Sequence, residues 1–279
     1  MNYGVLFCLI LAHVAGDFLF QKESIIRLRY SKGILKQLKG NEMHALVYLI
    51  ITLLCSLYYF SLKSLLFILI LTVSHFIIDL VKSIIVSKNS LRQYSIAIFL
   101  VDQFLHFSAI IAVSAYISNH YTSPSILNPV IIGIKGLLPL QGVVLTYSMK
   151  VFLAVILILV DLWGVGVFIR LFFNYLKYKS PEAKYKKNIE SGIIIIPQQN
   201  GGTRDGGFLI GILERLFIIT SIVLLKPEFI GFVLTAKSIA RFKKFDDDSF
   251  VEIFIIGTFI SFITAIFTGI IIKKLNIIP

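Results

Sequence analysis

Long runs of apolar residues constrain the fold of this chain more than any other feature. A helix needs roughly 17 to 25 mostly apolar residues to cross about 30 Å of hydrocarbon, and runs of this kind recur along the sequence. Hydrophobic residues make up 57% of the 279 residues and charged residues only 15%, which excludes an ordinary soluble domain. The alternating pattern of a transmembrane β-barrel is not seen. We therefore expect an all-α, polytopic bundle of transmembrane helices.

The apolar runs predict about eight membrane spans. They are expected at Tyr3–Phe20, Met43–Ser61, Ser64–Val86, Tyr94–Ser118, Val151–Phe173, Phe208–Leu225, Glu228–Phe242 and Phe250–Ile272. The seventh is short, so a re-entrant segment is an alternative there.

The distribution of basic residues predicts the orientation of the spans. The formal net charge of +12 comes from residues in the gaps between apolar runs, not from one basic surface, which argues against a nucleic-acid partner. Most loop lysines and arginines lie in 21–42, 87–93, 174–207 and 243–249. Positive loops stay in the cytoplasm, so the N-terminus is expected outside. We predict an N-terminal four-helix bundle (1–118), an external loop (119–149) and a C-terminal bundle (150–279) containing the cytoplasmic loop 174–207.

Three of the expected spans each carry a histidine and an aspartate four residues apart. Residues four apart lie on one face of a helix, about 40° from each other. The pairs are His13 with Asp17, His75 with Asp79, and Asp102 with His106, and His44 begins the second span. With the expected topology, all seven residues fall in the cytoplasmic half of the bilayer.

Burying these groups in a membrane has a cost that needs compensation. An ionised residue at the bilayer centre costs roughly 2.5 to 3.5 kcal/mol, whereas structural zinc binding returns on the order of 10 kcal/mol. Imidazole and carboxylate together suit zinc first, with iron or manganese as alternatives. One metal or two are both compatible with seven candidates. The alternative is a set of hydrogen bonds between helices.

The site residues predicted from this pattern have separate roles. We expect metal ligands among His13, Asp17, His44, His75, Asp79, Asp102 and His106, a general base among Asp17, Asp79 and Asp102, and hydrogen-bond partners of the ligands in Gln21 and Gln103.

A second polar cluster lies in the C-terminal half. Arg204, Arg215, Lys237 and Arg241, with Glu214, are expected to bind an anionic group such as a lipid phosphate at the inner leaflet. The alternative is snorkelling combined with an ion pair. Asp161 and Trp163 in the fifth span are weaker signals, and His120 is expected in the external loop without a catalytic role.

The motifs "LAHVAGDFLFQ", "HFIIDLVK", "VDQFLH" and "GILERLFIIT…IGFVLTAKSIARF" resemble an uncharacterised family of bacterial multi-pass membrane proteins, a domain of unknown function. The resemblance covers the N-terminal spans and a shorter C-terminal motif, and it includes Lys82 beside the cluster residues. It implies the bacterial cytoplasmic membrane and no established activity.

Three functions are compatible with these features. The first is a metal-dependent hydrolase acting on a lipid or lipid-linked substrate from the cytoplasmic side. It has an architectural likeness to intramembrane metal-dependent hydrolases, although the HExxH motif is missing. The second is a proton- or divalent-cation-coupled transporter. The third is a non-enzymatic membrane partner or sensor that docks through loop 174–207.

Overall fold

A computed structural model describes residues 3–57, 62–87, 94–120, 147–179, 206–246 and 248–277. Within these ranges the secondary structure is helical and contains no strand. The chain divides into two compact units, Met1–Ile156 and Leu157–Pro279, which are described separately. The expected all-α membrane fold is confirmed.

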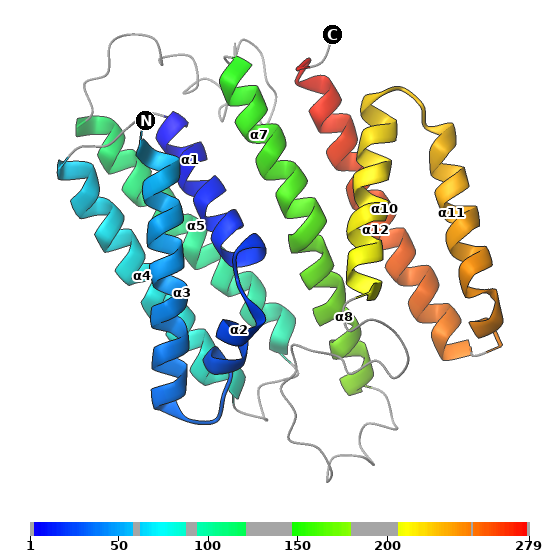
Figure 1. Ribbon diagram of the computed structural model, residues 1–279, viewed down its shortest axis with the longest axis horizontal. Helices are drawn as coiled ribbons and strands as arrows, with labels where there is room; N and C mark the ends of the chain where they lie inside the picture. Colours follow the sequence, from blue (N-terminus) through cyan, green and yellow to red (C-terminus); the bar gives the residue numbers. More distant parts are fainter. Residues whose placement is uncertain are drawn as a thin grey trace. The chain divides into compact units, whose positions relative to one another are not determined.

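The N-terminal unit is built from long helices that pack side by side (Figure 1). Its elements are α1 (Tyr3–Val14), the π-helical η1 (Ala15–Leu19), α2 (Glu23–Arg29), α3 (Ile34–Ser56), α4 (Leu62–Ser87) and α5 (Ser95–His120). Helix α1 packs against α3 and α5, and α4 packs between α3 and α5.

The helices of this unit are apolar outside, and they bury polar side chains next to apolar ones such as Leu9, Leu71 and Ile110. On α4, Thr72, His75, Asp79 and Ser83 are buried. The exposed side of the same helix carries Leu66, Val73, Ile77 and Val81. This arrangement is the one expected where lipid is the solvent, because apolar side chains contact hydrocarbon while polar side chains need protein partners.

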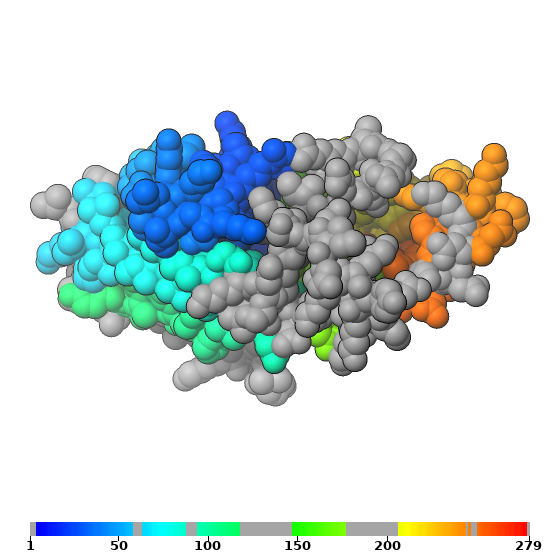
Figure 2. Space-filling view, turned by 90° about the horizontal axis from the view of Figure 1, so that it is seen from below, coloured from blue at the N-terminus to red at the C-terminus, as the bar shows by residue number. Residues whose placement is uncertain are grey.

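The first span is interrupted after η1, and the chain turns sharply. The Phe20 N–H bonds to the Ala15 carbonyl at 2.9 Å, and the following α2 lies at 88° to the preceding helix. Glu23 at the start of α2 pairs with Arg27 at 2.6 Å, an i,i+4 pair that stabilises this short helix. The blue surface of α2 and the start of α3 lies beside the ends of α4 and α5 when the molecule is seen from below (Figure 2). Helix α2 therefore covers one end of the unit.

The structure corrects the expected start of the second span. Residues 21–42 were expected as a cytoplasmic loop, but α2 lies there and α3 begins at Ile34, nine residues before the expected Met43. The reason is that Gln37 and Asn41 on the first turns of α3 point inward and are only 3% and 1% exposed. Their polarity lowers the hydropathy of the segment, although it continues the helix.

The second unit is also helical. Helix α7 (Tyr147–Leu159) contains the boundary between the units and continues through the π-helical η5 (Val160–Val165) into α8 (Gly166–Lys179). Then come α10 (Gly206–Val223), α11 (Glu228–Arg241), the short 3₁₀ helix η6 (Phe242–Lys244) and α12 (Asp248–Lys274). Within this unit, α10 and α12 pack against each other more extensively than any other pair of helices. A Cβ at Gly269 would lie 2.9 Å from Ile222, so glycine permits this close approach.

Among the described residues, six helices are long and apolar enough to cross a membrane, or up to seven if the bent α1–α2 pair forms one span. Helix α11 has 14 residues, short of a full crossing. The number of crossings and the side of the N-terminus stay predictions. The expected loops 119–149 and 174–207 lie mostly outside the described residues, although α5 reaches His120 and α8 reaches Lys179.

Candidate metal centre

The seven histidines and aspartates predicted from spacing come from five elements of the N-terminal unit. His13 lies on α1, Asp17 on η1, His44 on α3, His75 and Asp79 on α4, and Asp102 and His106 on α5. The structure brings all of them together inside the helix bundle. The Asp17 side chain is 9% exposed and is the most accessible, while the other six are nearly completely buried.

Two histidines of the cluster have ring nitrogens close to each other, and two aspartates each have a carboxylate oxygen at a similar distance from both nitrogens. His44 Nε2 and His75 Nε2 are 3.2 Å apart. Asp17 Oδ1 lies 3.2 Å from the His44 nitrogen and 3.4 Å from the His75 nitrogen. Asp79 Oδ2 lies 3.2 and 3.3 Å from the same two nitrogens. We call these four side chains the inner quartet.

These separations match those in a tetrahedral zinc site. Nitrogen and oxygen ligands about 2.0 to 2.1 Å from zinc, at tetrahedral angles, are ~3.3 Å from one another. His44, His75 and Asp17 therefore form a triangle of the size of one face of such a tetrahedron. Asp79 forms a second triangle with the same two histidines.

The remaining cluster residues lie next to the inner quartet. His106 Nδ1 is 3.1 Å from His75 Nδ1, and His106 Nε2 is 3.5 Å from Asp102 Oδ1. His13 lies against His106, with ring centroids 4.8 Å apart, and neither of its ring nitrogens has a hydrogen-bond partner among the described residues. His13, His75 and His106 form a further group with ligand atoms within 4.8 Å, as do Asp79, Asp102 and His106.

Two cations that the spacing argument did not place in the site contact its carboxylates. Arg29 of α2 is 2% exposed, and its Nη2 lies 2.5 Å from Asp79 Oδ1. Lys82 of α4 lies 2.6 Å from Asp102 Oδ2. Among the described residues, Asp17 has no lysine or arginine partner, and histidines are its ion-pair neighbours. One carboxylate of the cluster is thus left without a fixed positive charge.

Further polar side chains hold Arg29 in position. Its Nε donates to Asn41 Oδ1 at 2.9 Å, and Asn41 Nδ2 donates to Ser83 Oγ at 3.1 Å and to the Gln37 carbonyl at 2.8 Å. This network explains why the polar start of α3 is buried. The sequence gives little indication of this network, because the side chains that hold Arg29 are uncharged and the start of α3 has low hydropathy.

The two glutamines expected to support the ligands both contact the cluster. Gln103 Nε2 donates to Asp102 Oδ2 at 3.0 Å. With its amide oriented to satisfy both neighbours, Gln21 donates to the Asp17 carbonyl at 3.2 Å and accepts from Arg29. An aromatic residue that the sequence did not single out, Tyr48, stacks on His75 with ring centroids 4.0 Å apart and an interplanar angle of 5°. This stacking fixes the orientation of the His75 imidazole ring.

Of the residues expected to bind an anionic group in the C-terminal half, the structure describes those on α10 and α11. Arg215 is 2% exposed and donates to the Leu162 carbonyl at 2.6 Å and to Ser261 Oγ at 3.2 Å. Lys237 forms a 2.6 Å ion pair with Glu214. Arg241 ends α11, and Arg204 lies outside the described residues. The ion pair between Glu214 and Lys237 agrees with the alternative interpretation, in which these side chains snorkel and pair with each other.

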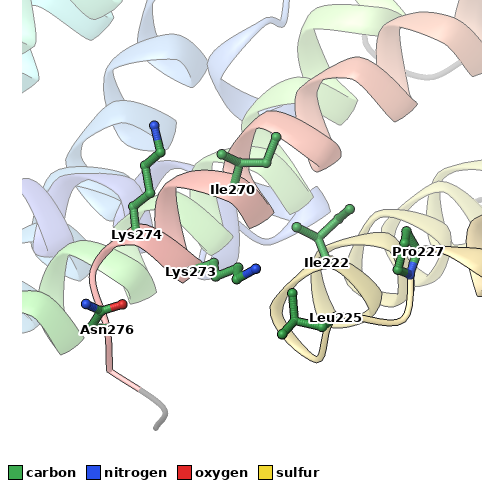
Figure 3. Close-up of a pocket in the computed structure, with 7 residues that line it drawn as sticks. All are labelled: Ile222, Leu225, Pro227, Ile270, Lys273, Lys274 and Asn276. Carbon is green, nitrogen blue, oxygen red and sulfur yellow. The ribbon is translucent and has the colours of Figure 1, made fainter.

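A pocket of about 410 Å³ in the second unit lies between the end of α10 and the end of α12 (Figure 3). Its lining is Ile222, Leu225, Pro227, Ile270, Lys273, Lys274 and Asn276. It includes no histidine or carboxylate, so it adds nothing to the candidate metal centre.

Comparison with known proteins gives a family match over part of the chain and no activity. Residues 5–133 match the model of a family described as a protein of unknown function (DUF3307). No curated protein and no solved structure matches the chain. The matched residues end before the C-terminal motif, whose resemblance stays a prediction. For residues 5–133, which contain all seven cluster residues, the resemblance to a family of unknown function is confirmed.

Proposed function

We propose that the N-terminal unit binds one zinc ion through His44, His75 and Asp17. The observation that carries this proposal is the triangle of ligand atoms with sides of 3.2, 3.2 and 3.4 Å. Hydrogen bonds alone do not satisfy the inner quartet. Two neutral imidazoles supply at most one proton each, and the His75 Nδ1 already faces another imidazole nitrogen.

The charge of the cluster favours one metal ion over two. The three carboxylates carry one negative charge more than Arg29 and Lys82 together neutralise. One divalent ion changes this excess to a single positive charge, while two would leave three positive charges inside a helix bundle in lipid. Asp17, which has no fixed cation beside it, is the carboxylate that needs the metal most.

Metal content tests the binding proposal. Protein purified in detergent without chelator should contain about one equivalent of zinc by mass spectrometry. His44→Ala and His75→Ala should lose it, whereas His120→Ala should retain it, because His120 lies about four turns along α5 from His106. Wild-type protein that stays folded but binds no zinc, iron or manganese when these are supplied would remove the proposal.

The proposed activity is hydrolysis of a lipid or lipid-linked substrate. Zinc held by His44, His75 and Asp17 would supply an activated water molecule, with its pKa lowered toward neutrality. Asp79 Oδ2 lies 3.2 and 3.3 Å from the ring nitrogens of His44 and His75, so Asp79 would be the general base beside such a water. What supports a lipid substrate is the apolar outer surface around the site. The basic loops support a site in the cytoplasmic half of the membrane, and the family resemblance supports a bacterial inner membrane.

Hydrolysis is measured with fluorescent phospholipid esters in proteoliposomes. Zinc-loaded protein should release product, and a chelator should stop the reaction until zinc is restored. A protein that binds zinc but hydrolyses no lipid ester or lipid phosphate would exclude this activity.

Transport of a divalent ion is the second candidate. It is favoured by the His13, His75 and His106 group, which shares His75 with the proposed zinc ligands and offers a neighbouring position. Zinc uptake into proteoliposomes under a pH gradient, lost in His13→Ala, would select transport over hydrolysis.

A further inference from the structure

The pocket between α10 and α12 lies where two candidate membrane spans end. Gly206–Val223 and Phe250–Lys274 are both long and apolar enough to cross a membrane, and the residues that line the pocket lie in the last turns of these spans or just beyond them. The level at which a span ends is the interface, where lipid headgroups meet water. The volume of about 410 Å³ is within the range of ligand sites. None of the lining residues takes part in the zinc proposal.

The lining of the pocket combines an apolar wall with a polar edge (Figure 3). Ile222 of α10 and Ile270 of α12 belong to the apolar wall. Lys273 extends from α12 toward the side of Ile222. Lys274 and Asn276 complete the polar edge. A ligand that matches both parts has an apolar segment joined to an anionic group.

The turn after α10 holds a large apolar side chain beside the pocket. Leu225 has a φ of 60°. Its N–H bonds to the Ile222 carbonyl at 3.2 Å, and the Lys226 N–H bonds to the Ser221 carbonyl at 2.9 Å. This is a turn that commonly ends a helix with glycine in the left-handed conformation, which leucine adopts only at an energetic cost. The Leu225 side chain is 63% exposed, so contacts within the unit do not compensate for this cost, whereas a ligand packed against it would.

The two lysines at the end of α12 are not needed to satisfy the backbone of that helix. The N–H groups of Leu275 and Asn276 already bond to carbonyls of its last turn, at 3.0 to 3.2 Å. The helix dipole favours lysine at this end but does not require a pocket beside it. Lys273 and Lys274 are both exposed, and neither forms an ion pair within the described part of the chain. Neighbouring ammonium groups repel each other, and an anion bound between them removes that repulsion.

We propose that this pocket binds an anionic phospholipid. Lys273 and Lys274 hold the phosphate, and the apolar wall around Leu225 holds the upper part of one acyl chain. A free phosphate would leave the apolar wall uncovered, and a zwitterionic lipid would bring its own cation close to the two lysines. The lipid is bound here and not hydrolysed, so the site is independent of the proposed zinc centre and its activity.

Native mass spectrometry of the full chain in detergent tests the site. Phosphatidylglycerol and phosphatidylcholine with the same acyl chains are titrated separately, and the dissociation constant of the first bound lipid is measured. Wild type should bind phosphatidylglycerol more tightly. The double variant Lys273→Gln, Lys274→Gln should bind phosphatidylglycerol about 10-fold more weakly or worse and lose the preference for it. Lys273→Arg, Lys274→Arg keeps both charges and should retain the preference. Lys63→Gln is the matched control, because Lys63 is an exposed lysine at the end of another candidate span and should behave as wild type.

Leu225→Gly tests the apolar wall separately from the charges. Glycine adopts the left-handed conformation readily, so without lipid this variant should unfold at the same temperature as wild type or a higher one. It should nevertheless bind both lipids more weakly, and unchanged lipid affinity would overturn the proposal. Equal affinity of wild type for the two lipids, or an unchanged preference in the double glutamine variant, would also overturn it. Glycerol phosphate that binds wild type as tightly as phosphatidylglycerol would assign the pocket to a soluble phosphate instead of a lipid.

Discussion

Asp17 and Asp79 contact the same two imidazoles but differ in their charged partners. Asp79 is paired with Arg29, while the ion-pair partners of Asp17 within the described part of the chain are histidines. We therefore expect Asp17→Asn to lose zinc, and Asp79→Asn to keep it while losing lipid hydrolysis, by about 10²-fold or more for a general base. Zinc content and hydrolysis are measured on the same samples. Loss of zinc in Asp79→Asn with retention in Asp17→Asn would exchange the two roles.

His106 sets the proton position on His75. If His75 binds zinc through Nε2, its Nδ1 carries the proton and donates to His106 Nδ1, 3.1 Å away. His106→Leu removes this acceptor and should weaken zinc binding by about 10- to 100-fold, as is usual for partners of ligating histidines. His106→Gln retains an acceptor and should lose less. Competition with a zinc chelator measures the zinc affinity of both variants. Equal affinities for wild type and His106→Leu would contradict the role of His106 as the hydrogen-bond acceptor of His75.

At the scale of single helices, part of the site follows from the sequence and part does not. The four-residue spacing places His75 and Asp79 on one face of α4, and the structure shows that face turned inward. Arg29 could not be found in this way. Hydropathy places it in a loop, and it reaches Asp79 only because the chain turns by 88° before α2 and packs that helix against α3. Periodicity describes a helix but not the direction of the next one.

The contact between α2 and α3 depends on Gly40. A Cβ there would lie 2.6 Å from the Arg29 amide nitrogen and 2.8 Å from Leu28 Cβ. Gly40→Ala should therefore push α2 away, costing about 1 to 3 kcal/mol of folding free energy. Because Arg29 would move with α2, zinc binding should weaken as well. Unfolding temperature and zinc affinity are the measurements.

Gly33→Ala is the matched control for this contact, because nothing lies within 4 Å of a Cβ there and its φ is −105°. It should leave stability and zinc affinity unchanged or slightly improved. If Gly40→Ala behaves in the same way, α2 does not hold Arg29 over the site.

At the scale of the whole molecule, the sequence predicted an N-terminal bundle that carries the His/Asp cluster and a separate C-terminal bundle, and the structure divides the chain into two compact units. All seven cluster residues lie in Met1–Ile156, while Asp161 and Arg215 lie in Leu157–Pro279. Hydropathy alone does not distinguish the halves, because both contain apolar runs interrupted by single charges, but the His/Asp spacing located the cluster in the first four expected spans. Among the described residues, the buried histidines all lie in the first unit, whereas the second unit buries Asp161, Glu214 and Arg215.

Zinc should therefore stabilise one unit only. Its ligands join η1, α3 and α4, so binding links elements that would otherwise open separately, and removal of zinc should speed amide hydrogen exchange there by about 10-fold or more. Helices α10 and α12 contribute no ligand and should exchange at the same rate with and without zinc. Hydrogen exchange with mass spectrometry measures both units in one sample, and His75→Ala should show no response to zinc in either. An equal change in α10 and α12 would contradict a site confined to the N-terminal unit, since a ligand protects only the elements whose opening breaks its contacts.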